Sequence, residues 1–301
     1  MLSSDPTHDG SRLGTWRGEP AVMRRAHRHD DLEVNVTVRG DMVYVLGGQV
    51  VRIPTGTTAV FWAAVPHQLV DRTPGAVAHW LVVPLDVVLR FGLAEQALGD
   101  LLRGEPATLH GADPEGLPAA WDVELTGPEP ELRAAALLEV EAWLRRRLFA
   151  VSRAGRAASD GGSGLSRGGA LSRGAALGGG VGMSRDVQVA TAMARDIAVH
   201  FREPLTVSRV AEAAHLSPGH AMMVFRRVVG TTVGAYLTQC RVAEAQRLLV
   251  TTAATTTEVG TRAGFTSQSA FYEAFRALCG EAPGAYRTRV LRGGAGSAGV
   301  R

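Results

Sequence analysis

The residues best suited to chemistry lie on two short helices that are predicted in the second half of the sequence. Each helix carries a large aromatic residue, Phe225 or Phe275, that we expect to face the protein interior. Side chains on the opposite faces could reach DNA bases, because a helix of this kind fits the major groove of B-DNA. On the second helix, Gln268 could pair with adenine and Glu273 with cytosine. These positions therefore indicate direct reading of bases.

The candidate DNA contacts differ between the two helices. Methionines on the first helix read thymine methyl groups and DNA shape rather than hydrogen-bond patterns, so we expect this helix to be a poor direct reader. Arginines nearby would bind phosphates and supply affinity more than specificity. The candidate DNA-binding residues are His220, Met222, Met223, Arg226, Arg227 and Arg209 from the first unit, and Ser267, Gln268, Ser269, Tyr272, Glu273 and Arg276 from the second.

Two helix-turn-helix units are predicted to position these side chains. The first covers residues 207–229 and the second covers 257–278, each with a short helix, a tight turn and a second helix. A longer predicted helix, 233–250, lies between the units and would hold them as one rigid body. Two recognition helices held in this way would enter successive segments of the major groove, about 34 Å apart. Predicted helices over 186–201 and 283–289 complete this half.

The first half of the sequence predicts short β-strands followed by a helix. Segments rich in β-branched and aromatic residues alternate with turn sequences, and Gly47-Gly48 is typical of a hairpin. Strands of this length and spacing predict a small barrel or sandwich. Residues 129–150 predict an amphipathic helix, which could form a dimer interface or pack on its own barrel. The predicted strands are 34–38, 42–46, 49–53, 59–62 and 77–84.

A glycine-rich segment, residues 151–183, separates the two halves. It holds 11 glycines and 5 serines without an apolar period, so we expect a flexible linker that lets the halves rotate freely. The charge also changes along the chain, because residues 1–150 carry a net −6 and residues 186–301 a net +5. A basic second half favours a polyanionic partner, although ordinary fluctuation would also give this difference.

The overall composition excludes several classes of protein. The chain has 301 residues, 46% hydrophobic and 20% charged, which is typical of a globular protein of about two domains. Its longest apolar stretch, 77–89, is interrupted by polar residues, and the N-terminus lacks the apolar core of a signal peptide. Two cysteines cannot build a disulfide scaffold. We therefore expect a cytoplasmic protein that makes no membrane contact.

Residues 205–287 resemble the DNA-binding domain of the AraC/XylS family of transcription regulators. The stretches that carry the resemblance are 263–276 (AGFTSQSAFYEAFR) and 280–287 (GEAPGAYR), together with Arg241, Ala245 and Leu248-Leu249 of the connecting helix. Two positions depart from the pattern, since Thr256 replaces a large aliphatic residue and Gly260 replaces alanine. Both departures should loosen the first helix of the second unit, because glycine within a helix costs ~1 kcal/mol relative to alanine. The resemblance implies a regulator that binds double-stranded DNA and RNA polymerase as a homodimer, and it favours activation.

Residues of the first half resemble the pattern of cupin barrels, which serve this family as sensors of small molecules. The residues that carry the pattern are His27, His29, Glu33, Gly40, Gly48, Pro54, Gly56 and His67. The resemblance implies that the ligand-binding residues are His27, His29, Glu33, His67, Trp62 and Trp80. We expect the lone His79 to be a core residue.

The histidines and Glu33 permit three interpretations. They suit sugar hydroxyls, and the preferred hypothesis is a sensor for a small sugar, such as an α-galactoside, with no metal and no cofactor. Imidazole and carboxylate also suit Fe, Mn, Ni or Zn, so a metal sensor or a metal-dependent enzyme fused to a DNA-binding domain is the alternative. An architectural DNA binder that senses nothing is the third hypothesis.

The sequence thus predicts an α+β protein of two domains that regulates transcription and is not an enzyme. The N-terminal domain is a cupin-like β-barrel with following helices, and the C-terminal domain is all-α with two helix-turn-helix units. The predicted boundaries are an N-terminal arm over 1–24, a sensor and dimerisation domain over 25–150, a flexible linker over 151–183, a DNA-binding domain over 184–291 and a disordered tail over 292–301.

Overall fold

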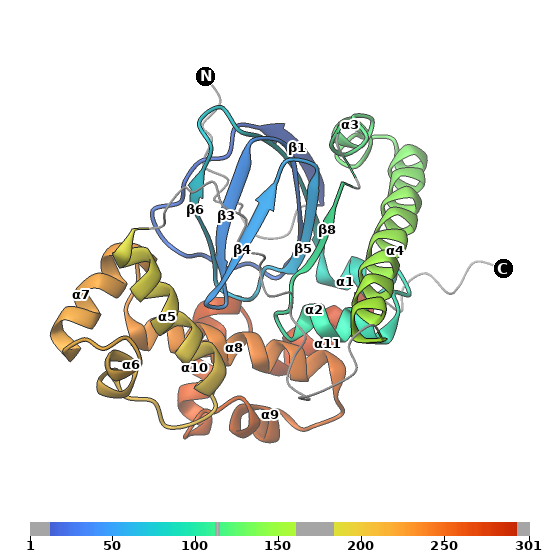
Figure 1. Ribbon diagram of the computed structural model, residues 1–301. Helices are drawn as coiled ribbons and strands as arrows, with labels where there is room; N and C mark the ends of the chain where they lie inside the picture. The colour runs from blue at the N-terminus through green and yellow to red at the C-terminus, as the bar shows by residue number, and fades with distance from the viewer. Residues whose placement is uncertain (1–12, 112, 114, 161–183, 294–301) are drawn as a thin grey trace.

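Two antiparallel sheets form the centre of the N-terminal half (Figure 1) of the computed structural model, which describes residues 13–111, 113, 115–160 and 184–293. One sheet has the strand order β1-β7-β2-β5-β8 and the other the order β4-β3-β6. The strands are β1 (Gly14–Gly18), β2 (Asp31–Arg39), β3 (Asp41–Leu46), β4 (Gln49–Pro54), β5 (Thr57–Trp62), β6 (His67–Arg72), β7 (Val77–Pro84) and β8 (Ala107–His110). With an all-helical second half, the predicted α+β fold class is confirmed.

All five predicted strands are present, and three further strands were not predicted. The Gly47-Gly48 hairpin is confirmed, since Leu46 pairs with Gln49 and both glycines have positive φ angles, 53° and 77°. Strand β6 was missed because its sequence, HQLVDR, is largely polar. Strands β1 and β8 were missed because one is short and glycine-bounded and the other has only four residues.

The sheets enclose one apolar core, and helices cover the outer face of the larger sheet. The inner core draws residues from both sheets, among them Tyr44, Phe61, Leu69 and Trp80. The outer core joins that sheet to the helices α1 (Leu85–Val88), α2 (Glu95–Leu102), α3 (Trp121–Glu124) and α4 (Pro130–Asp160). Inward residues of α4, such as Val140 and Leu144, belong to this core. The helix therefore packs on its own domain, as one of the two interpretations expected.

Three predicted segment boundaries differ from the structure. Helix α4 continues to Asp160, ten residues into the expected linker, because the glycine run starts only at Gly161 and good helix formers precede it. The rest of that linker, 161–183, lies outside the described residues. Strand β1 lies within the expected N-terminal arm and pairs with β7, and helix α11 extends through the first two residues of the expected tail. Residues 1–12 and 294–301 lie outside the described residues.

Seven helices make up the described C-terminal half. They are α5 (Arg185–His200), α6 (Val207–Ala213), α7 (Pro218–Val229), α8 (Val233–Thr251), α9 (Thr256–Arg262), α10 (Gln268–Cys279) and α11 (Pro283–Gly293). The side chains of Thr206, Thr232, Thr255 and Ser267 cap four of these helices by accepting a backbone N–H. Both predicted helix-turn-helix units, α6–α7 and α9–α10, are confirmed. In the described chain, no helix is long and apolar enough to span a membrane.

Helix α8 joins the two units. Near its N-terminal end, Tyr236 packs edge-on against Phe225 of α7, with ring centroids 5.5 Å apart. Near its C-terminal end, Leu248 and Leu249 share a core with Phe271 and Phe275 of α10. A helix of 19 residues is roughly 28 Å long, so the two recognition helices attach at well-separated points of one rod.

The two departures from the family pattern have structural counterparts in the second unit. A Cβ at Gly260 would lie 2.8 Å from a ring carbon of Phe271, so the missing side chain makes room for that ring. Thr256 is the first residue of α9, and its Oγ1 accepts a hydrogen bond from the Tyr272 hydroxyl at 3.1 Å. Gly260 thus leaves room for the Phe271 ring, and Thr256 gains a hydrogen bond to Tyr272.

The two halves also share a hydrophobic core. The sequence predicted halves that rotate freely, so this core was not expected. Trp62 and Leu85 of the sheet domain lie in one buried cluster with Leu249 and Tyr286 of the helical domain. The hairpin turn packs so closely on α5 that a Cβ at Gly48 would lie 2.1 Å from the backbone nitrogen of Arg195. In this arrangement the two domains are in direct contact.

We predict that the turns of the two units respond oppositely to substitution. His215 has φ +54°, which is unfavourable for a residue with a Cβ, whereas Gly264 occupies the same place in the second turn with φ +91°. Substitution His215→Gly should raise the free energy of unfolding by about 0.5–1 kcal/mol, measured by urea denaturation. Substitution Gly264→Ala should lower it by about 1–3 kcal/mol, because a Cβ there would lie 2.7 Å from the Cα of Arg202. A His215→Gly protein less stable than wild type would contradict this account.

Candidate DNA interface and sensor site

The predicted base-reading residues of α7 lie on its exposed face. His220, Met222, Met223 and Arg226 are exposed, whereas Ala221, Val224 and Phe225 are buried in the first unit. Two exposed methionines are unusual on a helix of a folded domain, with 49% and 55% of their surfaces free. The structure therefore presents an adaptable apolar surface where this helix would meet DNA.

The predicted residues of α10 divide into exposed and engaged side chains. Gln268, Ser269, Glu273 and Arg276 are exposed on the face opposite Phe271 and Phe275. The Ser267 hydroxyl accepts the backbone N–H of Ala270, so it caps the helix. Tyr272 is half-buried and bonded to Thr256, which leaves only part of its ring for a DNA contact.

Two of the three predicted phosphate-binding arginines of the first unit carry acidic partners. Arg209 on α6 forms an ion pair with Glu203 at 2.9 Å, and Arg227 on α7 forms one with Asp186 of α5. Exposed pairs of this kind contribute little to stability, so either arginine can exchange its partner for a phosphate.

In the sheet domain, the structure brings together His27, His29, His67 and Glu33, which we call the histidine cluster. One nitrogen of each imidazole lies within 4.8 Å of one nitrogen of the other two. Paired backbone hydrogen bonds of 3.0 Å between His27 and His67 hold the two segments side by side. The Oε2 atom of Glu33 lies 3.2 Å from Nε2 of His29 and 3.4 Å from Nε2 of His67.

Neighbouring groups orient the members of the cluster. The Nδ1 of His29 donates to the Asp31 carboxylate at 2.9 Å, and the Nδ1 of His67 donates to the Val65 carbonyl at 3.1 Å. The side-chain amide of Asn35 donates to Oε1 of Glu33 at 2.9 Å. Both rings thus turn Nε2 toward the same carboxylate oxygen, and Nε2 of His67 is buried without a hydrogen-bond partner.

The surroundings shift the pKa values of the cluster in different directions. Burial, together with the neighbouring His67, lowers the pKa of His27 to about 3. Burial of His29 is outweighed by its hydrogen bonds to Asp31 and Glu33, which raise its pKa to about 9. Burial of Glu33 is likewise outweighed by the rings of His29 and His67, which hold the pKa of that carboxyl well below its usual range.

The two predicted tryptophans lie apart from each other. Trp80 lies in the core between the sheets and stacks on Trp16, with ring centroids 5.7 Å apart. Trp62 was expected to contact the ligand, but it belongs to the core shared with the helical domain. The reason is that successive side chains of a strand point to opposite faces. Its neighbour Phe61 points inward, with its ring centroid 5.1 Å from that of His67, so Trp62 must point outward.

A polar network joins the cluster segment to the helical domain, and the sequence did not predict it. Asp30 accepts hydrogen bonds from Tyr286 at 2.6 Å and from Gln246 at 3.0 Å. Arg28 donates to the Ala64 carbonyl at 3.1 Å and also to the side chain of Gln246. Burial raises the pKa of Asp30 to about 6. The sequence holds one signal of this network, because the charged residues Arg28 and Asp30 alternate with His27 and His29 in a single stretch.

This network, which we call the interdomain contact, borders a polar pocket. The pocket has a volume of about 450 Å³, and His29 and Asp30 line it together with Gln246 and Tyr286. Because His29 belongs both to the histidine cluster and to this wall, the cluster lies next to the junction of the domains.

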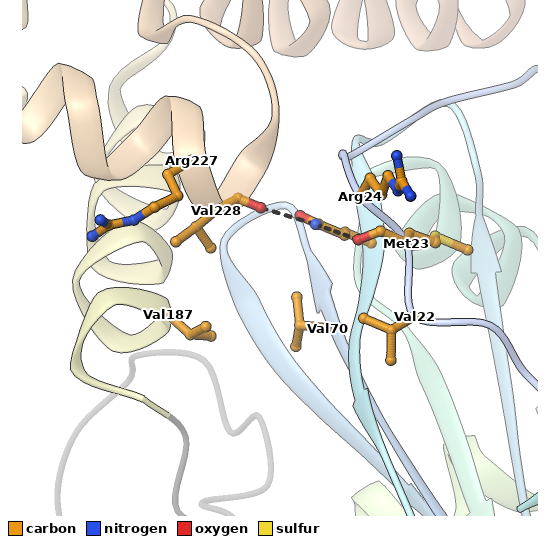
Figure 2. Close-up of a pocket in the computed structure, with 8 residues that line it drawn as sticks. Val22, Met23, Arg24, Val70, Val187, Arg227 and Val228 are labelled. Carbon is orange, nitrogen blue, oxygen red and sulfur yellow. Dashed lines mark hydrogen bonds between the residues drawn. The ribbon is translucent and has the colours of Figure 1, made fainter.

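A second junction, shown in Figure 2, lies beside the end of α7. Gln68 of β6 donates through its amide to the carbonyls of Met23 and Val228, at 3.0 and 2.9 Å. The backbone nitrogen of Ala26 donates to the Val229 carbonyl at 2.8 Å. Valine side chains and two arginines surround a pocket of about 470 Å³ here. The sheet domain therefore holds the C-terminal end of the first recognition helix.

Comparison with known proteins supports both halves of this description. Residues 210–289 match a family described as Helix-turn-helix domain. Over 272 residues the chain is 27% identical to the Melibiose operon regulatory protein of Escherichia coli K12, covering 89% of this chain and 85% of that protein. Over 88 residues it is 38% identical to the Transcriptional activator NphR of Rhodococcus, covering 29% of this chain and 26% of that protein.

Solved structures of regulators were found as well. The DNA-binding domain of AdpA in complex with a target DNA is 34% identical, with 35% of this chain and 95% of that chain covered and a TM-score of 0.32. Apo ToxT of Vibrio cholerae is 8% identical, with 93% of this chain and 95% of that chain covered and a TM-score of 0.37.

The helix-turn-helix match and the similarity that runs through both halves agree with the described geometry. Two recognition helices are attached to one connecting helix, and a β-rich domain contacts them directly. Residues 210–289 form a helix-turn-helix domain of the AraC type, and the chain is similar to a transcription regulator over 89% of its length.

Proposed function

We propose that this protein activates a carbohydrate-utilisation operon in response to a small sugar, such as an α-galactoside. The observation that carries the proposal is the position of the histidine cluster. It lies next to the contact between the sheet domain and the helical domain, which holds both recognition helices. Similarity to the Melibiose operon regulatory protein over 89% of the chain supports the sugar. In this proposal the protein acts in the cytoplasm, binds operator DNA and contacts RNA polymerase.

DNA recognition is divided between the two units. Exposed Gln268 and Glu273 on α10 carry hydrogen-bonding groups for adenine and cytosine, so this helix reads sequence. Exposed methionines on α7 read thymine methyl groups and DNA shape. Exposed arginines of both units neutralise phosphates and supply most of the affinity. All 32 basic residues of the chain are arginines, so every cationic phosphate contact uses a guanidinium group.

The effector is assigned to the histidine cluster. Its imidazoles and carboxylate offer both donors and acceptors to sugar hydroxyls. Trp80 lies across the inner core and offers an aromatic face, whereas Trp62 is excluded by its outward direction. His29 is the member of the cluster that lines the polar pocket between the domains.

The signal passes through the interdomain contact rather than through the linker. His27 and His29 face the cluster, whereas Arg28 and Asp30, which alternate with them, contact α8 and α11. A ligand that displaces the histidines would therefore also displace Arg28 and Asp30, which contact the helical domain. Such coupling requires that the effector bind one domain arrangement more tightly than another.

A homodimer would place two such readers on neighbouring DNA sites. Helix α4 packs one face on its own sheet, yet Leu138 and Phe149 on its other face are 67% and 63% exposed. Large apolar residues at this exposure are suited to contact with the same helix of a second copy. The helix that packs on its own domain can thus also supply the dimer interface.

We predict that Gln268→Ala weakens operator binding and relaxes the preference at one base pair. The loss should be about 1–3 kcal/mol at the adenine that Gln268 contacts, measured by fluorescence anisotropy with operator variants at fixed salt. The matched control is Gln96→Ala, which removes an exposed glutamine from the sensor domain. A Gln268→Ala protein that distinguishes the operator variants as strongly as wild type does would refute the assignment.

We predict that melibiose stabilises the protein. A ligand specific to the folded state raises the free energy of unfolding by about 2.7 kcal/mol at 100 times its Kd, which thermal denaturation detects. Trehalose, which lacks galactose, serves as the comparison sugar. Absence of a shift with every sugar tested would favour the architectural DNA binder.

We predict that Gln246→Ala uncouples sensing from DNA binding. The substitution removes the amide that bridges Arg28 and Asp30 but leaves the histidine cluster intact. Melibiose should still bind, whereas its effect on operator affinity, typically 5–150-fold for coupled sites, should fall toward onefold. The control is again Gln96→Ala, and a full effect of melibiose in the Gln246→Ala protein would show that the signal takes another route.

A further inference from the structure

We propose that Arg24 and Arg25 of the sheet domain bind the phosphate backbone of DNA beside the first recognition helix. This inference rests on DNA binding by the helical domain. It goes beyond the proposed function, which takes its phosphate contacts from the two helix-turn-helix units alone. The domain that holds the histidine cluster would thereby contribute directly to DNA affinity.

The segment that carries the two arginines is fastened to the C-terminal end of α7. The backbone nitrogen of Ala26 donates to the Val229 carbonyl at 2.8 Å. The Gln68 amide donates to one carbonyl of each segment and so joins them a second time (Figure 2). A Cβ at Gly230, the residue that ends α7, would lie 2.7 Å from the Cα of Arg25. Backbone contacts therefore hold this segment, and they leave both arginine side chains free to bind something else.

Gly230 continues a row of exposed residues on α7. Its backbone N–H donates to the Arg226 carbonyl at 3.1 Å. Met223 and Arg226 precede Gly230 by seven and four residues, a spacing that places all three along one side of a helix. All three residues are exposed, on the side that carries the predicted DNA contacts. Because Arg25 packs on Gly230, it lies beside the end of this row.

The length of α7 brings its end close to the DNA backbone. The helix has 12 residues and is roughly 18 Å long, whereas the major groove is about 12 Å wide. In helix-turn-helix proteins the N-terminal residues of the recognition helix contact the base edges. The C-terminal end then extends to the edge of the groove, where the phosphates lie. The arginines beside that end would lie there too.

The positive charge at this end of α7 is mostly uncompensated. Arg24 and Arg25 are exposed, and Arg24 lines the same pocket as Arg227 (Figure 2). Among the residues that the structure describes, Arg24, Arg25 and Arg226 have no ion-pair partner, and Arg227 is paired with Asp186. We call these four arginines the arginine patch. Four guanidinium groups with a single carboxylate partner attract a polyanion such as the DNA backbone.

The test measures how DNA binding by the full-length protein depends on salt. The probe is the duplex that wild type selects from a random-sequence library, and fluorescence anisotropy measures its affinity between about 50 and 200 mM salt. Each phosphate contact contributes about 0.9 to the slope of log affinity against log salt. Substitution of both residues, Arg24→Gln with Arg25→Gln, should therefore reduce the magnitude of this slope by about 1.8. Affinity at about 0.1 M salt should fall roughly tenfold.

Matched variants separate a phosphate contact from a change in net charge. Arg17→Gln with Arg146→Gln also removes two exposed arginines of the sheet domain, and it should leave the slope unchanged. Arg146 is on α4, which lies on the opposite side of the molecule from α7 (Figure 1). Arg24→Lys with Arg25→Lys keeps both charges and should retain most of the slope. Circular dichroism verifies that each variant is folded.

Two further measurements show where and how the arginines act. Phosphate contacts carry no sequence information, so the double glutamine variant should distinguish altered duplexes as strongly as wild type does. An iron-EDTA group attached at Arg25→Cys should cleave the duplex beside the base pairs cleaved from Met223→Cys. The same group at Arg146→Cys should not cleave there. The natural cysteines are buried or half-buried, and unsubstituted protein treated in the same way gives the background.

The inference is overturned if the folded double glutamine variant keeps the wild-type slope. It is equally overturned if the Arg17→Gln, Arg146→Gln protein loses as much of the slope, because net charge alone would then explain the effect. An increase in affinity on removing Arg24 and Arg25 would show instead that this segment obstructs DNA. A wild type that selects no duplex would refute DNA binding itself, whereas a selective wild type with an unchanged slope in the variant refutes this inference alone.

Discussion

The contact that the rest of the structure depends on is made by five consecutive residues, 27–31, between the two domains. Successive side chains of this segment point to opposite sides, so His27 and His29 enter the sheet domain while Arg28 and Asp30 contact α8 and α11. Neither set of contacts can shift without disturbing the other, because one short stretch of backbone carries both. The histidine cluster and the contacts to the helical domain are thereby placed within a few bonds of each other.

Helix α8 extends this connection to both recognition helices. The first unit packs near one end and the second near the other, through Phe225 with Tyr236 and through Phe275 with Leu248. The sheet domain contacts this assembly in two places, at the end of α7 and at Gln246 of α8. It therefore contacts the helical domain both at the end of one recognition helix and on the helix that joins the two units.

Much of the fold could be predicted because its signals are local. The helices of the second half follow from caps, glycine stops and a 3.6-residue apolar period, each of which acts within a few residues. Strand β6 and the pairing of β1 with β7 could not be predicted, because their stability comes from partners distant in the sequence. Trp62 was misplaced for a related reason, since a residue type does not reveal which face of a strand is covered by another domain.

The sequence by itself determined the DNA reader, its two recognition helices and the residue types of the histidine cluster. It also determined that positive charge in the second half comes from arginine alone. Only the tertiary structure decided that the halves share a core, that Asp30 joins Tyr286 and Gln246, and that Nε2 of His67 is buried without a partner. The physical reason is distance along the chain. Periodicity and capping act between neighbours, whereas a tautomer, a buried lone pair and a contact across more than two hundred residues exist only once the chain has folded.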